Sequence, residues 1–260
     1  MTATTPSVLL ADAVVHAVTR LSPAYVRVEL AAPEFVDLGE DGFDTRFKVI
    51  LPGPDGTLGP LPERVEDWYA AWLATPPDVR PTIRTYTVRD VVRDASGVRL
   101  VVDLVVHEDR GHGQGPACRW ALGAAPGDVV RVVAPHRLAP YGGTEFAPGV
   151  RRRLLLVGDE TAVPAVARIL EDLGPGHTGE VFLEVPACAD VQDLPTRPGL
   201  RVTWLVRRDT PYNHGLVQEV RRHLGLPGPV PAVPGTPGPP TGTCGRRRST
   251  PPPGRTSGPG

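Results

Sequence analysis

The hydrophobic pattern changes character near Pro148, and this change constrains the fold more than any other feature of the chain. Before it, short segments such as residues 26–30 alternate apolar and polar side chains, with Pro, Gly and Asp between the segments. Such alternation is typical of antiparallel strands with one solvated face. After it, residues 154–157 are continuously apolar and lead through a turn into a helical repeat, which indicates a buried parallel sheet. We therefore expect two different domains.

Residues 1–148 are expected to form a small antiparallel β-barrel. The expected strands are residues 8–18, 24–30, 46–51, 84–89, 98–107 and 129–133. A long proline-bounded connection contains one segment with helical spacing, residues 65–73, for which we expect a short helix docked on the strands. Its two tryptophans, Trp68 and Trp72, either anchor that packing or form a binding platform, and the pattern favours packing.

Residues 149–226 alternate strands with helices, which is typical of a Rossmann-like nucleotide-binding α/β domain. The expected strands are residues 151–157, 181–185 and 202–206, and the expected helices are residues 163–170 and 213–224. The last segment, residues 227–260, contains 11 Pro and 8 Gly but no acidic residue, no aromatic residue and no leucine. Such a segment cannot bury a hydrophobic core, so we expect a disordered tail.

The strand expected at residues 84–89 has side chains suited to a ligand that carries both a phosphate and a flat ring. Arg84 and Tyr86 share one face and lie roughly 7 Å apart, at about 3.3 Å per residue. A guanidinium grips phosphate through a planar fork of donors, and a tyrosine ring can lie against an aromatic system. The alternative is an ordinary half-buried strand with a surface arginine, which these six residues alone favour.

A glycine-rich loop, residues 108–117, leads into a short helix expected at residues 118–124. Free backbone amides and the helix dipole point at any ligand in front of a helix N-terminus, so the loop is a candidate anion site. Glycine-rich loops are also common as plain hairpin connections, and the pattern alone leaves both interpretations open.

Several classes of function are disfavoured by charge and composition. The formal net charge of −1 gives no reason to expect a nucleic acid partner. No run of about 18 apolar residues occurs, so membrane insertion is not expected, and residues 1–10 lack the features of a secretion signal. Cys118, Cys188 and Cys244 are widely scattered, and no His/Cys/Asp/Glu cluster has metal-ligand spacing. We expect a cytoplasmic protein without a metal site of its own.

Taken together, these features resemble the siderophore-interacting proteins, which are flavin-dependent ferric-siderophore reductases within the ferredoxin–NADP reductase-like superfamily. Four stretches carry the resemblance, which covers about residues 8–224. They are Arg46-Phe47-Lys48; Trp68 and Trp72 with Arg80-Pro81 and Arg84 to Arg89; Val106-His107 with Gly115-Pro116-Ala117, Trp120-Ala121 and Pro126-Gly127-Asp128; and Val157 to Ala165. The last stretch is the most specific.

The resemblance implies that the barrel holds FAD and that the α/β domain binds NADH or NADPH. The implied FAD site uses one strand, with the residues Arg84, Thr85, Tyr86 and Thr87. Arg84 pairs with phosphate, Tyr86 packs against the isoalloxazine ring, and Thr87 hydrogen-bonds the polar edge of the ring.

The resemblance also places His107 near the ribose or the pyrophosphate of FAD. The implied pyrophosphate loop consists of Gly115, Pro116, Ala117 and the helix start through Trp120. Without the resemblance, a single histidine at a strand end is more often a surface or capping residue.

The turn Gly158-Asp159-Glu160-Thr161 is the fourth implied cofactor-binding element. Its two carboxylates would repel a pyrophosphate at close range, so we expect the turn to meet the nicotinamide or ribose, or to orient the flavin side. Its other role is N-terminal charge on the following helix, with Thr161 or Asp159 as cap. Arg207 and Arg208 either receive a 2′-phosphate, which would favour NADPH, or are exposed arginines at a strand end, and the sequence favours the second interpretation.

The implied substrate is a ferric siderophore, which is often anionic and would be steered by basic side chains beside the flavin. Lys48 is the first candidate because it is the only lysine of the chain and matches a basic position of the family. Arg137 is the second, although the Ala134-Pro135-His136-Arg137 turn departs from the form usual in the family. Iron would arrive inside its chelate.

The C-terminal segment departs from the family, whose members continue after residue 224 with another strand, a turn and a further helix. We hypothesise a frameshifted end beyond Leu226, which leaves the α/β domain incomplete. Loss of that strand would expose an unpaired sheet edge.

The expected function is therefore transfer of electrons from NAD(P)H, or from a reduced ferredoxin, through FAD to chelated Fe(III), with no catalytic residue beyond FAD itself. One alternative is a general flavin or ferredoxin-type reductase. The other is a flavin- or siderophore-binding protein without turnover.

Overall fold

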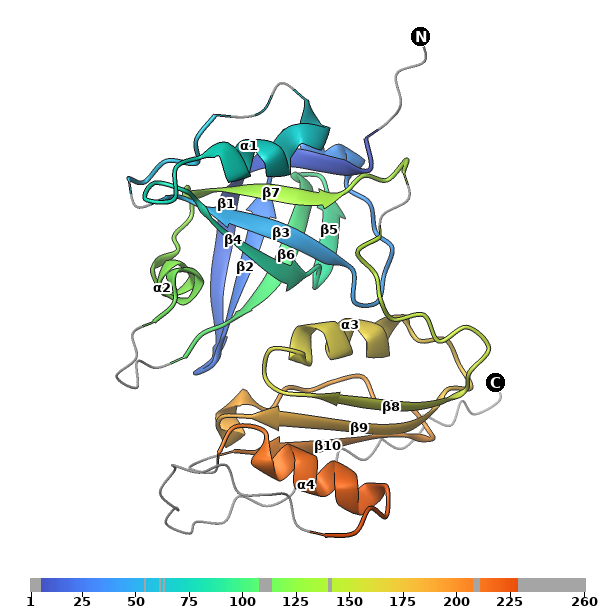
Figure 1. Cartoon of the computed structure of the whole chain (residues 1–260). Coiled ribbons are helices and arrows are strands. Elements are labelled where there is room, and N and C mark those ends of the chain that lie inside the picture. Colours follow the sequence, from blue (N-terminus) through green and yellow to red (C-terminus); the bar gives the residue numbers. More distant parts are fainter. Residues whose placement is uncertain are drawn as a thin grey trace.

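The computed structural model of the chain describes residues 6–53, 55–60, 62, 64–107, 114–139, 142–207 and 211–228. Within these ranges, a curled antiparallel sheet and a smaller α/β unit lie one above the other (Figure 1). The two kinds of structure expected on either side of residue 148 are thus both present. The boundary itself, drawn between residues 148 and 149, stays a prediction.

Seven strands form the curled sheet in the order β4-β3-β7-β1-β2-β6-β5. They are β1 (Val8–Ser22), β2 (Tyr25–Ala31), β3 (Arg46–Leu51), β4 (Thr82–Thr87), β5 (Asp90–Asp94), β6 (Gly97–Val105) and β7 (Val129–Pro135). Every neighbouring pair is antiparallel, and alternate side chains of β1 from Leu9 to Val15 are buried. The expected antiparallel barrel is confirmed in this curled form.

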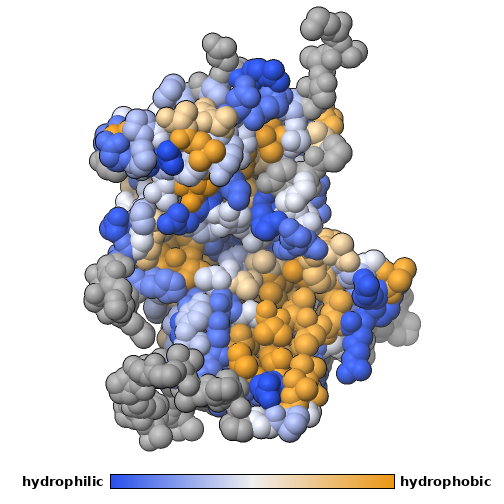
Figure 2. Space-filling view, in the orientation of Figure 1, coloured by the Kyte–Doolittle hydropathy of each residue, from blue (hydrophilic) through white to orange (hydrophobic). Residues whose placement is uncertain are grey.

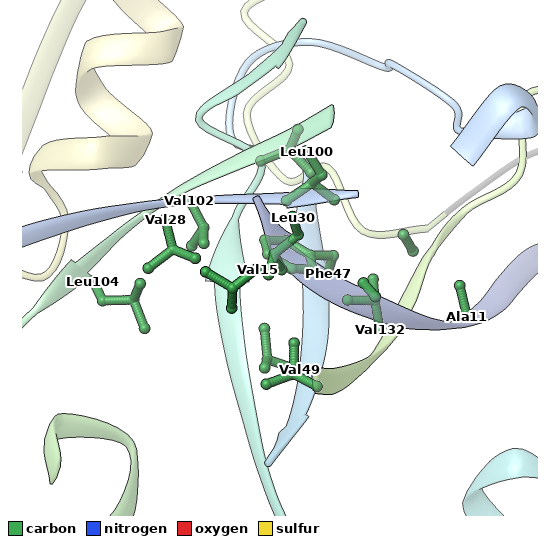
Figure 3. Packing of buried hydrophobic residues seen from close by; sticks show 14 of the residues in the cluster. Ala11, Val15, Val28, Leu30, Phe47, Val49, Leu100, Val102, Leu104 and Val132 are labelled. Carbon is green, nitrogen blue, oxygen red and sulfur yellow. The ribbon is translucent and has the colours of Figure 1, made fainter. Parts of the chain in front are cut away.

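Side chains from distant strands meet in the core of this sheet. Leu30, Phe47 and Leu100 are fully buried, and Figure 3 shows them close together among the other members of the cluster. Burying a side chain of this size stabilises the fold by about 1.5–3 kcal/mol. Because Phe47 belongs to β3, the core fixes β3 in place, and β3 in turn positions its partner β4.

The hairpin between β5 and β6 was not foreseen from the sequence. Its turn is short: the side chain of Asp94 accepts the backbone N–H of Ser96 at 2.8 Å, and Gly97 has φ +116°. Only glycine adopts such a conformation without strain. β5 contains just two apolar residues, Val91 and Val92, which is too short a pattern to identify a strand.

The helix expected in the long connection is present and begins slightly later than predicted. α1 (Trp68–Ala74) follows a single 3-10 turn, η2 (Val65–Asp67). The indole Nε1 of Trp72 donates to the carbonyl of Pro81 at 2.7 Å, and the Arg80 guanidinium lies 5.1 Å from the Trp72 ring centre. Trp72 thus fastens the helix to the segment that leads into β4.

The α/β unit contains three parallel strands in the order β10-β9-β8. The strands are β8 (Arg153–Gly158), β9 (Thr178–Val185) and β10 (Leu200–Val206), and the helices are α3 (Val163–Asp172), α4 (His214–His223) and the 3-10 turn η3 (Cys188–Asp190). α3 lies between this sheet and the barrel, and α4 lies on the other face (Figure 1). The expected strand–helix alternation is confirmed.

β8 is an edge strand of this three-stranded sheet. Two of its apolar side chains, Leu155 and Val157, are 42% and 43% exposed. Figure 2 shows hydrophobic residues gathered over the lower half of the visible face, where Figure 1 draws β8. An unpaired, apolar strand edge of this kind can pair with other chains.

Specific contacts join the two sheets. The carboxylate of Asp190, which is buried, accepts the Ser22 hydroxyl at 2.6 Å and the Ala24 N–H at 2.8 Å. Arg89 forms two hydrogen bonds of 2.7 Å with Glu171 at the end of α3. The barrel and the α/β unit are therefore held in a fixed relation.

Two further expectations concern the ends of the chain and the membrane. Residues 229–260, which contain most of the expected disordered tail and Arg246 to Arg248, lie outside the described residues. Among the described helices, none has the length and apolar character needed to cross a membrane.

Candidate FAD and nicotinamide site

Strand β4 brings Arg84 and Tyr86 to the inner face of the curled sheet. Tyr86 lies opposite Phe47 of β3, and Arg84 lies opposite Val49, and both partners are buried. The Tyr86 ring packs against the barrel core, and burial raises the pKa of its hydroxyl to about 12. The strand thus offers a ring held by packing beside an exposed guanidinium, as the sequence predicts.

The other face of β4 carries Thr85 and Thr87. Thr85 lies opposite Lys48, whose ammonium donates to the Thr85 hydroxyl at 2.6 Å. Thr87 lies opposite Arg46. β4 is an end strand of the sheet. Lys48, the first predicted substrate residue, therefore contacts the predicted FAD-binding strand on the face opposite to Arg84 and Tyr86.

Helix α2 (Pro116–Gly123) packs its first turn against the same core. Ala117, Cys118 and Trp120 contact the cluster that also contains Tyr86. Its N-cap is Gly115, which makes no side-chain cap and has open space where a side chain would project. Pro116 has no N–H, and the amides that follow it, those of Ala117 and Cys118, have no side-chain cap, which suits a bound anion. Residues 108–113 of the glycine-rich loop lie outside the described residues.

His107 lies directly beside the start of α2. Its backbone N–H donates to Cys118 Sγ at 3.3 Å, and its carbonyl accepts the Gln114 amide at 3.0 Å. The side chain of His107 is 53% exposed. The structure therefore gathers Tyr86, His107 and the N-terminus of α2 in one region, although they are far apart in sequence.

The turn after β8 is shaped by its own side chains. Asp159 accepts both the N–H and the hydroxyl of Thr161, at 2.9 and 2.6 Å, and it also accepts the Tyr212 hydroxyl at 2.8 Å. Burial raises the pKa of Asp159, but these hydrogen bonds outweigh it and hold the pKa below its usual value. A side chain at Gly158 would lie 2.4 Å from Cβ of Ala162, so the turn requires glycine there.

The expected capping role of Asp159 or Thr161 is not what the structure shows. The N-cap of α3 is Ala162, which makes no side-chain cap, and Pro164 stands in the first turn. Asp159 instead closes the turn locally through Thr161. Because α3 begins at Val163, both Asp159 and Thr161 lie before its N-cap position.

Glu160 points inward and is fully buried. The Arg207 guanidinium donates to its two carboxylate oxygens at 2.8 and 2.9 Å, and to Glu184 of β9 at 3.3 Å. The Glu160 carbonyl accepts the hydroxyl of Tyr25 from the barrel at 2.8 Å. Glu160 Oε1 also lies 3.9 Å from Nδ1 of His107. The turn therefore meets the predicted flavin site at His107.

Both interpretations of Arg207 offered by the sequence placed it at the surface, and both are wrong in that respect. Its side chain is only 11% exposed and is bound by two buried carboxylates, so it is not free to receive a 2′-phosphate. Arg208 lies outside the described residues. The signal that sequence reasoning missed is the single charge, Glu184, inside the apolar strand of residues 181–185.

The second predicted substrate residue, Arg137, is exposed and paired with Asp37 at 2.8 Å on the turn after β7. Within the described ranges, no group of three or more His, Cys, Asp or Glu side chains could hold a metal ion. Arg84 is exposed, its guanidinium donates to the Ile83 carbonyl at 2.8 Å, and it has no ion-pair partner in the part of the chain that the structure describes. Such a guanidinium can supply positive charge to a diphosphate such as that of FAD.

Known protein families match both parts of the chain. Residues 14–139 match the siderophore-interacting FAD-binding domain, and residues 151–233 match the siderophore-interacting protein family. The chain belongs to the siderophore-interacting protein family. Among solved structures, a siderophore utilization protein from T. fusca is similar at 31% identity with a TM-score of 0.66, over 84% of this chain and 77% of that one.

Two curated relatives have named activities. The ferric vibriobactin reductase ViuB of Vibrio cholerae is 31% identical over 187 residues, which are 72% of this chain and 63% of ViuB. The NADPH-dependent ferric-chelate reductase of Escherichia coli is 28% identical over 207 residues, which are 77% of this chain and 73% of that protein.

Proposed function

We propose that this siderophore-interacting protein is an FAD-dependent reductase of ferric siderophores. The observation that carries the proposal is the convergence of the Arg84–Tyr86 strand, the uncapped start of α2 and the turn at Glu160 around His107. When bound, FAD would accept a hydride from NADH or NADPH and pass single electrons to chelated Fe(III), so that Fe(II) leaves the siderophore.

The residues of the barrel would bind and orient the flavin. Arg84 and the amides that begin at Gly115 would neutralise the diphosphate, and Tyr86 would support the isoalloxazine ring, with Thr85 and Thr87 along the same strand. Ala117 and Trp120 hold α2 against the core, which keeps the amides aimed at one place. The protein would thus supply position and charge, while the redox chemistry belongs to the cofactor.

The substrate would bind at the edge of β4 next to Lys48. Its ammonium already donates to Thr85, so it lies beside the strand that would hold the flavin. A cation there would attract an anionic ferric chelate and shorten the path for electron transfer. Arg137 would add positive charge farther along the barrel, where it is shared with Asp37. The names of the ViuB and E. coli relatives support a ferric chelate as the substrate class.

The electron donor would be NADPH or NADH, bound at the carboxyl ends of β8 to β10 where the Gly158–Thr161 turn lies. The NADPH dependence in the name of the E. coli relative supports the first. A reduced ferredoxin is the other donor that we propose to test. A nicotinamide donor and the release of Fe(II) both suit the cytoplasm, which is the compartment we propose.

Anaerobic mixing tests the proposal directly. The purified protein, loaded with FAD, shows flavin absorbance near about 450 nm, which bleaches when the flavin is reduced. It is mixed with NADH, NADPH or reduced ferredoxin, then with a ferric siderophore and a Fe(II) indicator. Bleaching by a donor followed by Fe(II) release on adding the chelate is the expected result. Bleaching followed by electron transfer only to free flavin indicates a general flavin reductase, and absence of bleaching with every donor indicates a binding protein.

A further inference from the structure

A buried cluster of three charged side chains joins the carboxyl ends of the strands in the α/β unit. It consists of Glu160 in the turn after β8, Glu184 in β9 and Arg207 just after β10. Both carboxylates are fully buried, and the Arg207 side chain is 11% exposed. Arg207 contacts Glu160 with two hydrogen bonds, which is the geometry in which a guanidinium holds a carboxylate in one orientation.

The second carboxylate anchors the cluster to α4. Glu184 accepts the N–H groups of Asn213 and Leu216, at 3.0 and 3.1 Å, at the start of that helix. Glu184 also accepts a hydrogen bond from the Arg207 guanidinium, so both of its carboxylate oxygens are hydrogen-bonded. The position of the Arg207 guanidinium is therefore set by the sheet and by α4, and Glu160 is held by Arg207 in turn.

On the barrel side, this cluster faces His107. The Tyr25 hydroxyl donates to the Glu160 carbonyl, which fixes the turn against β2, and Glu160 Oε1 lies 3.9 Å from Nδ1 of His107. That distance is within ion-pair range but too long for a direct hydrogen bond. A carboxylate facing Nδ1 favours the tautomer that carries its proton on that nitrogen, which leaves Nε2 without a proton on the other side of the ring.

We propose that Arg207 is a positioning residue for the flavin site: it holds the Glu160 carboxylate against Nδ1 of His107, so that the imidazole keeps its proton there and presents Nε2 to the FAD. The identity of the ligand rests on the proposed function, whereas the orientation of His107 does not. In this arrangement the nicotinamide side of the molecule contributes to flavin binding through one buried carboxylate. Arg207 then orients Glu160 and does not recognise a nucleotide phosphate.

The test measures the tautomer of His107 in the flavin-free protein by ¹⁵N NMR of the imidazole, with the signal assigned from a His107→Gln variant. Wild type is expected to carry the proton on Nδ1. Glu160→Gln and Arg207→Lys are expected to move it toward Nε2, the tautomer that free imidazole side chains prefer. The matched control is Glu180→Gln, because Glu180 forms an ion pair with Arg201 in the same two strands but far from the turn, and it should change nothing.

A second measurement is FAD affinity, followed by quenching of flavin fluorescence. Glu160→Gln and His107→Gln are expected to weaken FAD binding by about the same factor, roughly tenfold, and the double variant by no more than either, because they act through one group. Arg207→Lys keeps the positive charge and guards against loss of folding. An unchanged His107 tautomer in Glu160→Gln, or additive losses in the double variant, would overturn the proposal. If wild type does not bind FAD at all, the proposed function fails, and the tautomer result still decides the role of Arg207.

Discussion

Removing the Arg207 charge should destabilise the fold strongly. In Arg207→Met, an apolar side chain of similar length replaces the guanidinium, and the buried carboxylates of Glu160 and Glu184 lose their counter-charge. Breaking a buried ion pair by removing one partner costs about 3–5 kcal/mol, because a buried charge remains uncompensated. For a protein of this size, that corresponds to a decrease of roughly 6–20 °C in melting temperature.

Thermal unfolding, followed by circular dichroism and by calorimetry, measures this change. Arg201→Met is the matched control: Arg201 lies in β10, the strand that Arg207 follows, and it pairs with Glu180, but its side chain is 55% exposed, so we expect no measurable shift. The Arg207→Met, Glu160→Gln double variant should recover part of the loss, since one of the two stranded charges is then removed. A melting temperature in Arg207→Met within 2 °C or so of wild type would refute the argument that the cluster is a buried, coupled unit.

Four further predictions follow from the barrel and the sheet edge. Arg84→Ala should weaken FAD binding about 10- to 100-fold with little change in melting temperature, and equal loss of both would return the strand to a structural role. Lys48→Ala should raise KM for a ferric siderophore while leaving the flavin spectrum intact; an unchanged KM would remove Lys48 from the substrate site. In wild type, the Tyr86 hydroxyl loses its proton near pH 10 in the unfolded chain but only near pH 12 in the folded protein, so the free energy of unfolding falls by about 2–3 kcal/mol between these pH values. Tyr86→Phe should abolish this fall, which denaturant titrations across the pH range measure. Leu155→Lys should reduce self-association in light scattering without unfolding the protein, and unaltered association would show that self-association does not occur through the β8 edge.

The sequence predicts the fold well wherever the signal is local. Alternation of apolar and polar side chains identifies β2, and a continuous apolar run identifies β8, because each pattern involves only neighbouring residues of the sequence. β5 was missed because its two apolar residues are too few to show a period. The start of α3 agrees with the sequence, but the expected capping role of Asp159 does not, because its carboxylate accepts the Thr161 N–H and closes the preceding turn.

The candidate site also has a part that the sequence predicts locally and a part that it does not. Arg84 and Tyr86 can be assigned to one face from their spacing alone, since a strand has a period of two residues. The link between Glu160, Glu184 and Arg207 cannot be read from spacing, because it depends on which strands are neighbours and in what register. Only the order β10-β9-β8 brings these three residues together, and nothing local in the sequence states that order.

The nature of the buried cluster argues for a role beyond stability. Replacing a buried ion pair by apolar side chains of similar volume is often neutral or stabilising, so a fold gains little from keeping charges inside for stability alone. Here the charges lie at the carboxyl ends of parallel strands, where α/β sheets bind their ligands, and one of them faces His107 across the boundary with the barrel. An ion cluster holds a carboxylate in a fixed orientation at that boundary, which apolar side chains cannot do. The geometry of Glu160 is thus better explained by the group it faces than by the free energy of unfolding it contributes.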